Sequence, residues 1–333
     1  MNRCLIVFLL IALIFSSCSK KDSSIQSESN IAPKKIYLIA YSDNDEYYMN
    51  GLMSAMKGVF EKNNIYENKD YSLRILSAQA DMSGIPTLID MAKNDKPDLL
   101  ITFHSAVLYS AIARAPELKK IFSIVSNPFI LGAGKSDTDH IANLTGAYDI
   151  EPADALISFS KECFPHIKKI GLIYMLGEEE SEFLKNNVSQ ICQKMKLEFE
   201  AQPYTTKNEI SDAINSLFAK KIDAVIHTQD LNCDLTYAQL SKKSAETKIP
   251  FLAYWNEENS NAAVICDNDD SIAFNKFADM VLTAFKGGEP TKMPFVNIVY
   301  DNIFNINLKA AEASGFHISD SVLKKAHKII GRD

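Results

Sequence analysis

Hydroxyl, amide, carboxylate and aromatic side chains recur where short apolar runs of the sequence end. Such runs are typical of strands buried in a parallel sheet, and ligands of open α/β sheets bind outside the carboxyl ends of the strands. Hydroxyls, amides and free backbone N–H groups there suit a polar or anionic ligand group, and aromatic rings suit a flat one. The candidate ligand-binding residues are Tyr41, Ser42, Gln79, Ser105, Ser126, Asn127, Tyr148, Tyr174, Thr228, Asp230, Trp255 and Asp267.

Ordinary structural roles remain open for several of these residues. Ser42 and Ser105 precede helical patterns and would serve as N-caps. Trp255, the only tryptophan in the chain, is equally compatible with burial in a core. Asp267 would cap the helical pattern that follows it. His104 and His227 occupy equivalent strand ends, where packing or capping is favoured over contact with a ligand.

The chemistry of common enzymes and metal sites is absent from the sequence. It contains no HExxH, no GxSxG and no GxGxxG after a strand. The six histidines show no metal-ligand spacing, so neither a metal nor another cofactor is predicted. The run from Gly132 to Ser136 ends like a phosphate-binding loop, but the first glycine of that motif would fall at Phe129. We therefore interpret this run as a surface loop.

The elements that position the candidate residues occur twice. A basic, apolar run at 34–41 is matched by a similar run at 168–174, and each is followed by the same alternation of helical and strand patterns. Repeated βαβ units predict an α/β protein with two Rossmann-like lobes joined by a multi-strand hinge. The first lobe is expected at 35–146 plus about 268–290, and the second at 147–267 plus about 291–333.

The first 34 residues are not expected to fold with the lobes. Arg3 and an apolar run at 5–15 are typical of a signal peptide, predicted at 1–17. Small residues before Cys18 resemble the lipobox of bacterial lipoproteins, in which the cysteine becomes the acylated N-terminus. An ordinary signal peptide with an incidental cysteine is the alternative. The polar, Ser-rich segment that follows Cys18, up to residue 34, is interpreted as a flexible tether.

Composition narrows the class of partner. The 333 residues are 47% apolar, which is enough for two cores, and the net charge of −7 argues against nucleic acid and against an anionic membrane bound through a basic face. Beyond Cys4 and Cys18, the remaining four cysteines are dispersed and are expected to be free, mostly buried thiols.

Several short segments, taken together, carry a family resemblance. They are 77–81 with Gln79, 121–128, 143–146, 168–174, 248–250 and 307–311. This set resembles the substrate-binding lipoproteins of ABC transporters with the type I periplasmic-binding fold, a family that includes tryptophan and tyrosine binders. The resemblance covers roughly 36–330. It departs from the family pattern at strand ends, for example where His104 stands in place of a glycine.

The resemblance implies a non-enzymatic, exported protein, lipid-anchored at the periplasmic or extracellular face of the cell membrane. It would be a monomer that passes a small ligand, expected to be an amino acid with aromatic amino acids among the candidates, to ABC permease and ATPase subunits. Asp267 would face the ligand ammonium, and Ser105, Ser126 and Asn127 its carboxylate. The alternatives are a sensing lipoprotein that signals through a receptor, or a nucleoside- or sugar-binding variant of the fold.

Replacing Cys18 tests the anchor. Cys18→Ala removes the only thiol at the end of the signal-like run, so the protein should be released from membranes or left unprocessed, and should lose its lipid label. A three-chain anchor would be firm, because each buried methylene contributes about 0.8 kcal/mol. Fractionation and metabolic lipid labelling measure both effects. A variant that stays in the membrane and keeps its lipid label would reject acylation at Cys18.

Overall fold

The computed structural model of the protein describes residues 32–43, 46–227, 230–255, 260–299 and 302–331, so Cys18 and Thr228 lie outside the described part. The first lobe is built on a six-stranded, parallel sheet of order β11-β5-β4-β3-β1-β2. Its elements are β1 (Lys34–Ala40), α1 (Glu46–Lys62), β2 (Tyr71–Ser77), η1 (Met82–Gly84), α2 (Ile85–Asp95), β3 (Leu99–Phe103), α3 (Ser105–Arg114), β4 (Lys120–Ser123), β5 (Leu144–Tyr148), α8 (Ser271–Phe285), η3 (Pro290–Lys292) and β11 (Val296–Asn297).

The second lobe is built on a seven-stranded sheet of order β13-β12-β10-β9-β8-β6-β7. Only the β10–β12 pairing is antiparallel. The elements are α4 (Ala153–Cys163), β6 (Lys169–Met175), α5 (Glu179–Lys194), β7 (Glu198–Tyr204), η2 (Lys207–Glu209), α6 (Ile210–Ala219), β8 (Ala224–Ile226), α7 (Cys233–Thr247), β9 (Phe251–Ala253), β10 (Ala262–Asp267), β12 (Ile303–Asn307), α9 (Leu308–Ala313), α10 (Asp320–Leu323) and β13 (Lys328–Ile330).

The strand orders confirm the predicted repeat. Strands β2-β1-β3-β4-β5 of the first sheet and β7-β6-β8-β9-β10 of the second follow the same spatial order. In both lobes a helix follows most strands and returns the chain for the next parallel strand, as the geometry of a parallel connection requires. The predicted fold class, two Rossmann-like α/β lobes, is therefore confirmed.

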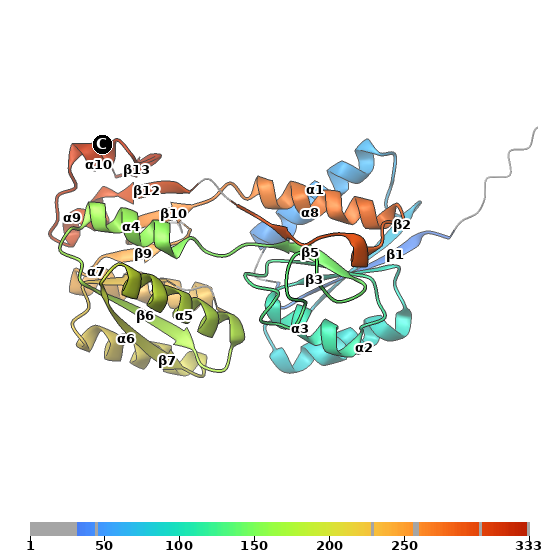
Figure 1. Cartoon of the computed structure of the whole chain (residues 1–333), viewed down its shortest axis with the longest axis horizontal. Helices are drawn as coiled ribbons and strands as arrows, with labels where there is room; N and C mark the ends of the chain where they lie inside the picture. The colour runs from blue at the N-terminus through green and yellow to red at the C-terminus, as the bar shows by residue number, and fades with distance from the viewer. Residues whose placement is uncertain (1–31, 44–45, 228–229, 256–259, 300–301, 332–333) are drawn as a thin grey trace, which may run out of the picture. The chain divides into compact units, whose positions relative to one another are not determined.

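Alternation along β1 shows how the first lobe buries both faces of its sheet. Ile36 and Leu38 pack with α1 and α8, whereas Tyr37 and Ile39 pack with α2 and α3. Successive strand side chains point to opposite faces, so a strand covered on both sides must be apolar throughout. Figure 1 shows α1 and α8 on one face of this sheet and α2 and α3 on the other.

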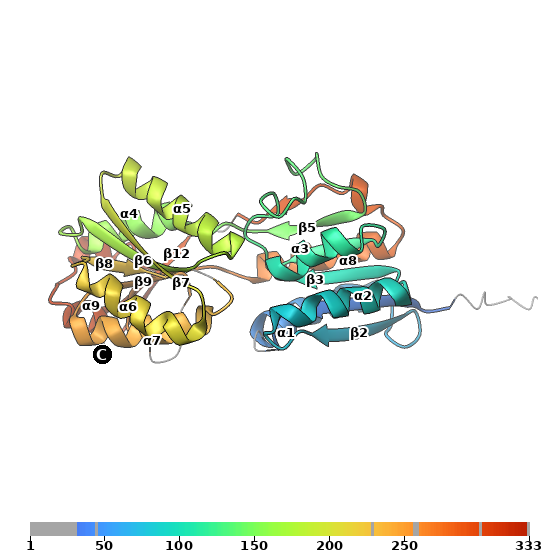
Figure 2. The ribbon, with the colours of Figure 1, turned by 90° about the horizontal axis from the view of Figure 1, so that it is seen from below.

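The second lobe repeats this layering. Leu172 of β6 belongs to the core under α4 and α5, and its neighbour Ile173 belongs to the core under α6 and α7. Figure 2 shows these two pairs of helices on opposite sides of the second sheet. Cys163, Cys192 and Cys266 are buried free thiols and Cys233 is half-buried, as predicted. No described helix has the length and apolarity needed to cross a membrane.

The chain changes sheets between β5 and α4, between β10 and α8, and between β11 and β12. Sheet membership differs from the predicted lobe boundaries at two points, because β5 extends to Tyr148 and β11 pairs with it in the first sheet. The last crossing therefore follows β11, and not the segment at 288–292 where we expected it. Helix α8 leads away from the carboxyl ends of the strands. The parallel strand β11 then returns the chain to that edge of the sheet, from which it crosses to β12.

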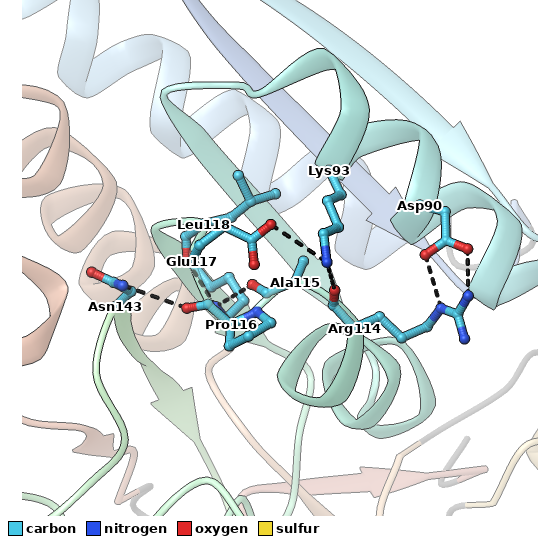
Figure 3. A network of polar contacts seen from close by, with 9 residues as sticks. Asp90, Lys93, Arg114, Ala115, Pro116, Glu117, Leu118 and Asn143 are labelled. Atoms are coloured by element: carbon cyan, nitrogen blue, oxygen red, sulfur yellow. Dashed lines mark hydrogen bonds and ion pairs between the residues drawn. The ribbon is translucent and has the colours of Figure 1, made fainter.

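Ion pairs and hydrogen bonds to carbonyl oxygens lie at the opposite edge of the first sheet, where β4 and β5 begin. Figure 3 shows Arg114 paired with Asp90, and Lys93 donating to the carbonyl of Arg114 at 2.9 Å and pairing with Glu117 at 3.6 Å. These side chains are about half-exposed, so each pair contributes little to stability. Their role is local, and they lie away from the carboxyl ends of the strands.

Lys120 is the buried member of the same region. Its Nζ donates to the carbonyl oxygens of Ala115 at 2.8 Å and Leu118 at 2.7 Å. Burial lowers the pKa of Lys120 to about 8, because these carbonyls replace only part of the lost hydration. The link between α3 and β4 is thereby fastened to the first residue of β4.

Close packing against Phe122 explains why residue 146 is a glycine. It lies inside β5, and a Cβ there would sit 2.4 Å from the ring of Phe122 and 2.5 Å from its carbonyl oxygen. Gly146→Ala should therefore lower the free energy of unfolding by about 1–3 kcal/mol through overpacking.

Gly58→Ala provides the matched control for Gly146→Ala. A Cβ at Gly58 in α1 meets nothing within 4 Å, so this change should raise stability by about 0.5–1 kcal/mol through helix propensity. Urea denaturation measures both variants. Equal stability of Gly146→Ala and the wild type would contradict the packing argument.

Candidate ligand-binding site

The chain turns through unusual backbone conformations where the strands of the first sheet end. Gln79 after β2, His104 after β3 and Ile124 after β4 have φ values of 52°, 75° and 58°. Residues other than glycine rarely adopt positive φ, and such strain is concentrated at functional sites. His104, with ψ 151°, occupies a region that is essentially reserved for glycine. The positive φ of Ile124 also explains why β4 ends at Ser123, although the apolar run continues to Val125.

Ser105 does not cap the helix that it begins. The N-cap position of α3 is His104, and the Ser105 hydroxyl is buried with no hydrogen-bond partner among the described atoms. The capping role that we considered for Ser105 is therefore not what the structure shows. A buried hydroxyl without a partner at the start of a helix remains available to a ligand.

The donors after β4 are already engaged by the protein. The backbone N–H of Ser126 donates to Glu180 Oε1 at 2.6 Å, although Glu180 belongs to α5 of the second lobe. The Asn127 side chain accepts the backbone N–H of Phe129 at 3.0 Å, which closes a local turn. These groups were predicted to receive the carboxylate of a ligand, and in this structure a carboxylate of the protein occupies one of them.

Two of the predicted aromatic residues belong to the cores. Tyr41 and Tyr148 are buried, and their hydroxyls donate to the Ala80 carbonyl and to Asp137 Oδ1, each at 3.0 Å. Tyr254, which follows β9, is also buried, in the second lobe. The structure thus assigns these rings packing roles, and Trp255 and Tyr174 remain only partly buried.

Trp255 rests on an aromatic base formed by His227 and Tyr237. Its ring centroid lies 4.6 Å from that of His227 and 5.3 Å from that of Tyr237. His227 is completely buried, and burial lowers its pKa to about 3, so it is a neutral packing residue. The Lys185 ammonium lies 4.6 Å from the centroid of the Tyr174 ring in a cation–π contact.

Asp267 ends β10 without capping the next helix. Its Oδ1 accepts from the Asn268 backbone at 3.0 Å and its Oδ2 from Asn305 Nδ2 at 3.2 Å. Asp269 instead accepts the N–H of Ser271, the first residue of α8. The helix-capping alternative for Asp267 is therefore not seen. Ser42 is buried, and Gln79 donates its backbone N–H to the Ser77 hydroxyl at 3.0 Å.

Sequence reasoning missed a group of carboxylates at this edge. We call Glu151, Glu178, Glu180 and Asp230 the acidic cluster; of these, only Asp230 was among the predicted site residues. Burial, followed by the charge of Glu180, raises the pKa of Glu178 to about 8. Burial raises the pKa of Asp230 to about 6 and that of Glu151 well above its usual value, with Glu180 the next cause for Glu151.

The signal for this cluster was present but ambiguous. Glu178 to Glu180 form an acidic run just after β6, and Glu151 follows β5. Glutamates at the start of a helix are ordinarily explained by the helix dipole and by capping. Glu178 does cap α5 by accepting the Ser181 N–H at 2.6 Å.

Comparison with known proteins decides the family. The profile of the ABC transporter substrate binding protein family matches residues 46–330. The chain belongs to this family. Its members are binding proteins that work outside the cytoplasm with ABC transporters, so a small-molecule ligand and ABC transporter subunits are its partners.

Two kinds of relative agree with this assignment. The chain is 26% identical over 258 residues to a tyrosine-binding protein of Clostridioides difficile, covering 76% of this chain and 74% of that one. It is similar in structure to the ABC domain in complex with L-Trp from Streptococcus pneumonia, with a TM-score of 0.79, 19% identity and coverage of 90% and 100%.

A ligand-free, open substrate binding protein with adhesive properties from Clostridium difficile gives a TM-score of 0.67 at 21% identity, with coverage of 90% and 100%. At these identities the solved structures establish the fold alone, which is the type I periplasmic-binding fold.

The acidic cluster predicts how the stability of this ABC substrate-binding protein depends on pH. A carboxyl whose folded pKa is raised stabilises the fold while it is protonated, and this stability is lost as the pH rises through the folded pKa. Between pH 6.5 and 8, Glu178 should thus lower the free energy of unfolding by about 1–2 kcal/mol, and Glu151 should act in the same direction. The lowered pKa of His227 changes the free energy of unfolding mainly at lower pH, below this window.

Glu151→Gln tests the source of that pH dependence. The groups that face Glu151 are Glu180, Asp149 and Glu178, all acidic, so removing its charge should raise stability at pH 8 and flatten the pH profile. Glu179→Gln, at an exposed position next to Glu180, is the control with the same change in net charge. Urea melts at several pH values decide; a wild-type stability that rises from pH 6.5 to 8 would contradict the interpretation.

Proposed function

We propose that this protein is the lipid-anchored, monomeric substrate-binding component of an ABC importer. We further propose that its ligand is a small molecule with an amino group and a flat ring, of the class to which aromatic amino acids belong. The observation that carries this proposal is that buried carboxylates and a partly buried tryptophan follow β6, β8 and β9, whose carboxyl ends lie at one edge of the second sheet. Carboxylates suit an amino group, and the face of an aromatic ring suits another ring.

The acidic side of the proposed site is formed by the acidic cluster and Asp267. Glu151 keeps carboxylate oxygens that are buried and have no hydrogen-bond partner among the described atoms. Buried polar groups are normally paired, so such atoms mark a place where a partner binds. The ligand amino group would supply that partner.

The aromatic side is proposed at Trp255. Its ring packs against His227 and Tyr237 and is only partly buried, and the ring of the ligand would contact it there. The Tyr237 hydroxyl donates to the Trp255 carbonyl at 3.0 Å, which fixes the backbone at this position. The relatives with tyrosine and L-Trp in their names support a ring-bearing ligand for this chain.

Hinge motion of the lobes about their connecting segments would close the site, as is common for two-domain binding proteins. The proposed ligand-binding set keeps Ser42, Gln79, Ser105, Ser126, Asn127, Tyr174, Thr228, Asp230, Trp255 and Asp267, and adds the three glutamates of the acidic cluster. Tyr41 and Tyr148 are left out, because their rings pack in the cores.

Ligand binding should change the fluorescence of Trp255, the only tryptophan of the chain. A thermal-shift screen of amino acids, aromatic amines, nucleosides and sugars on the chain from residue 19 identifies binders, and a ligand at a hundredfold excess over its Kd should add about 2.7 kcal/mol of stability. Fluorescence titration with a binder that lacks an indole then reports directly on Trp255.

Asp267→Ala should weaken binding by about tenfold to a hundredfold if this carboxylate contacts the amino group. Calorimetry on the variant and the wild type measures the change. A screen in which sugars or nucleosides bind and no ring-bearing amine or amino acid does would contradict the proposed function.

A further inference from the structure

Glu151 is a buried carboxyl group that the fold itself does not use. Its side chain is 7% exposed, and neither carboxylate oxygen has a hydrogen-bond partner among the described atoms. The charges that act on it are those of Glu180, Asp149 and Glu178, and its own backbone N–H offers only a weaker, opposing contact. Burying such a group without a partner is costly, so its presence calls for a cation from outside the fold.

The rest of the acidic cluster is equally short of positive charge. Asp230 is 9% exposed, and its carboxylate contacts the Tyr204 hydroxyl and accepts the Asn232 backbone N–H at 2.8 Å, so its partners carry no positive charge. None of the ion pairs found within the described residues includes a member of the cluster. Nor do any three described His, Cys, Asp or Glu side chains form a group that could hold a metal ion. The geometry therefore favours an organic cation over a metal.

Glu180 adds a second, independent observation. Its Oε1 accepts the backbone N–H of Ser126 at 2.6 Å, and Ser126 follows the strand end where a ligand carboxylate would be expected to bind. A ligand carboxylate at this position would have to displace Glu180 and would then lie beside the charges of the cluster. Like charges brought together without a cation disfavour a complex strongly.

We propose that this protein selects a ligand of net positive charge, an aromatic amine without a carboxylate, over the corresponding zwitterionic amino acid. The inference rests on the proposed function and narrows its ligand class. Glu151 and Asp230 receive the ammonium group. Glu180 holds the Ser126 N–H, takes the place of a ligand carboxylate, and thereby determines specificity.

Matched ligand pairs test the proposal on the unmodified protein. Calorimetry compares tyramine with tyrosine and tryptamine with tryptophan, each pair differing only in the carboxylate. The amine should bind about tenfold to a hundredfold more tightly than its amino acid, the effect of one uncompensated charge–charge contact. Raising the salt concentration should weaken the preference, because screening reduces charge discrimination at partly exposed positions.

Glu180→Gln tests the specificity role directly. Glutamine keeps an oxygen that accepts the Ser126 N–H but removes the negative charge, so tyrosine should gain affinity relative to tyramine by about tenfold. Glu179→Gln is the matched control: it lies beside Glu180 in the first turn of α5, is exposed, and should leave the ratio unchanged. Melting temperatures of both variants establish that they fold.

The outcomes separate the two proposals. Tighter binding of amines, with a ratio that falls in Glu180→Gln and not in Glu179→Gln, supports the inference. Amino acids that bind the wild type as tightly as their amines overturn it and leave the proposed function standing. Binding of only sugars or nucleosides overturns both.

Discussion

Burial of both faces of the parallel sheets determines where this protein can do chemistry. Ile36 to Ala40 and Ile170 to Ile173 are almost completely buried, so these stretches of the inner strands β1 and β6 have little room for polar side chains. Polar groups are therefore displaced to the strand ends, and parallel strands deliver those ends to one edge of each sheet. The helices on each face cover the strands, and the proposed site is formed by residues that follow the carboxyl ends of the strands.

The order of elements was predictable because it depends on local pattern. The apolar runs at 34–41 and 168–174 lie close to the observed bounds of β1 and β6, and the repeat of the pattern indicated two lobes. Tertiary effects were not visible in this way. The early end of β4 depends on the positive φ of Ile124, and the assignment of β11 to the first sheet depends on its pairing with β5. Gly146 is needed for its contact with Phe122, which no local pattern reveals.

The site was predicted only in part, and for a physical reason. Position at a strand end identifies candidate residues but not their direction, so Tyr41 and Tyr148 were expected at the ligand and instead complete the cores. The glutamates were overlooked because an acidic residue at a helix start already has a sufficient explanation. What distinguishes Glu151 and Glu180 is their surroundings, which are assembled from segments far apart in the sequence.

The acidic cluster links the stability of the protein to its proposed ligand. Groups whose burial raises their pKa oppose folding at neutral pH, and a protein tolerates them where function requires a destabilised site. A cation that binds only the folded state restores the lost stability by mass action. The same arrangement of Glu151, Glu178 and Glu180 therefore explains two properties. It raises the pKa of the buried carboxyls without a ligand, and it favours a ligand of positive charge. The Ser126–Glu180 contact also bears on how the ligand is oriented. Glu180 occupies the N–H group that a ligand carboxylate would take, so the ligand amino group makes the more favourable contacts with the site.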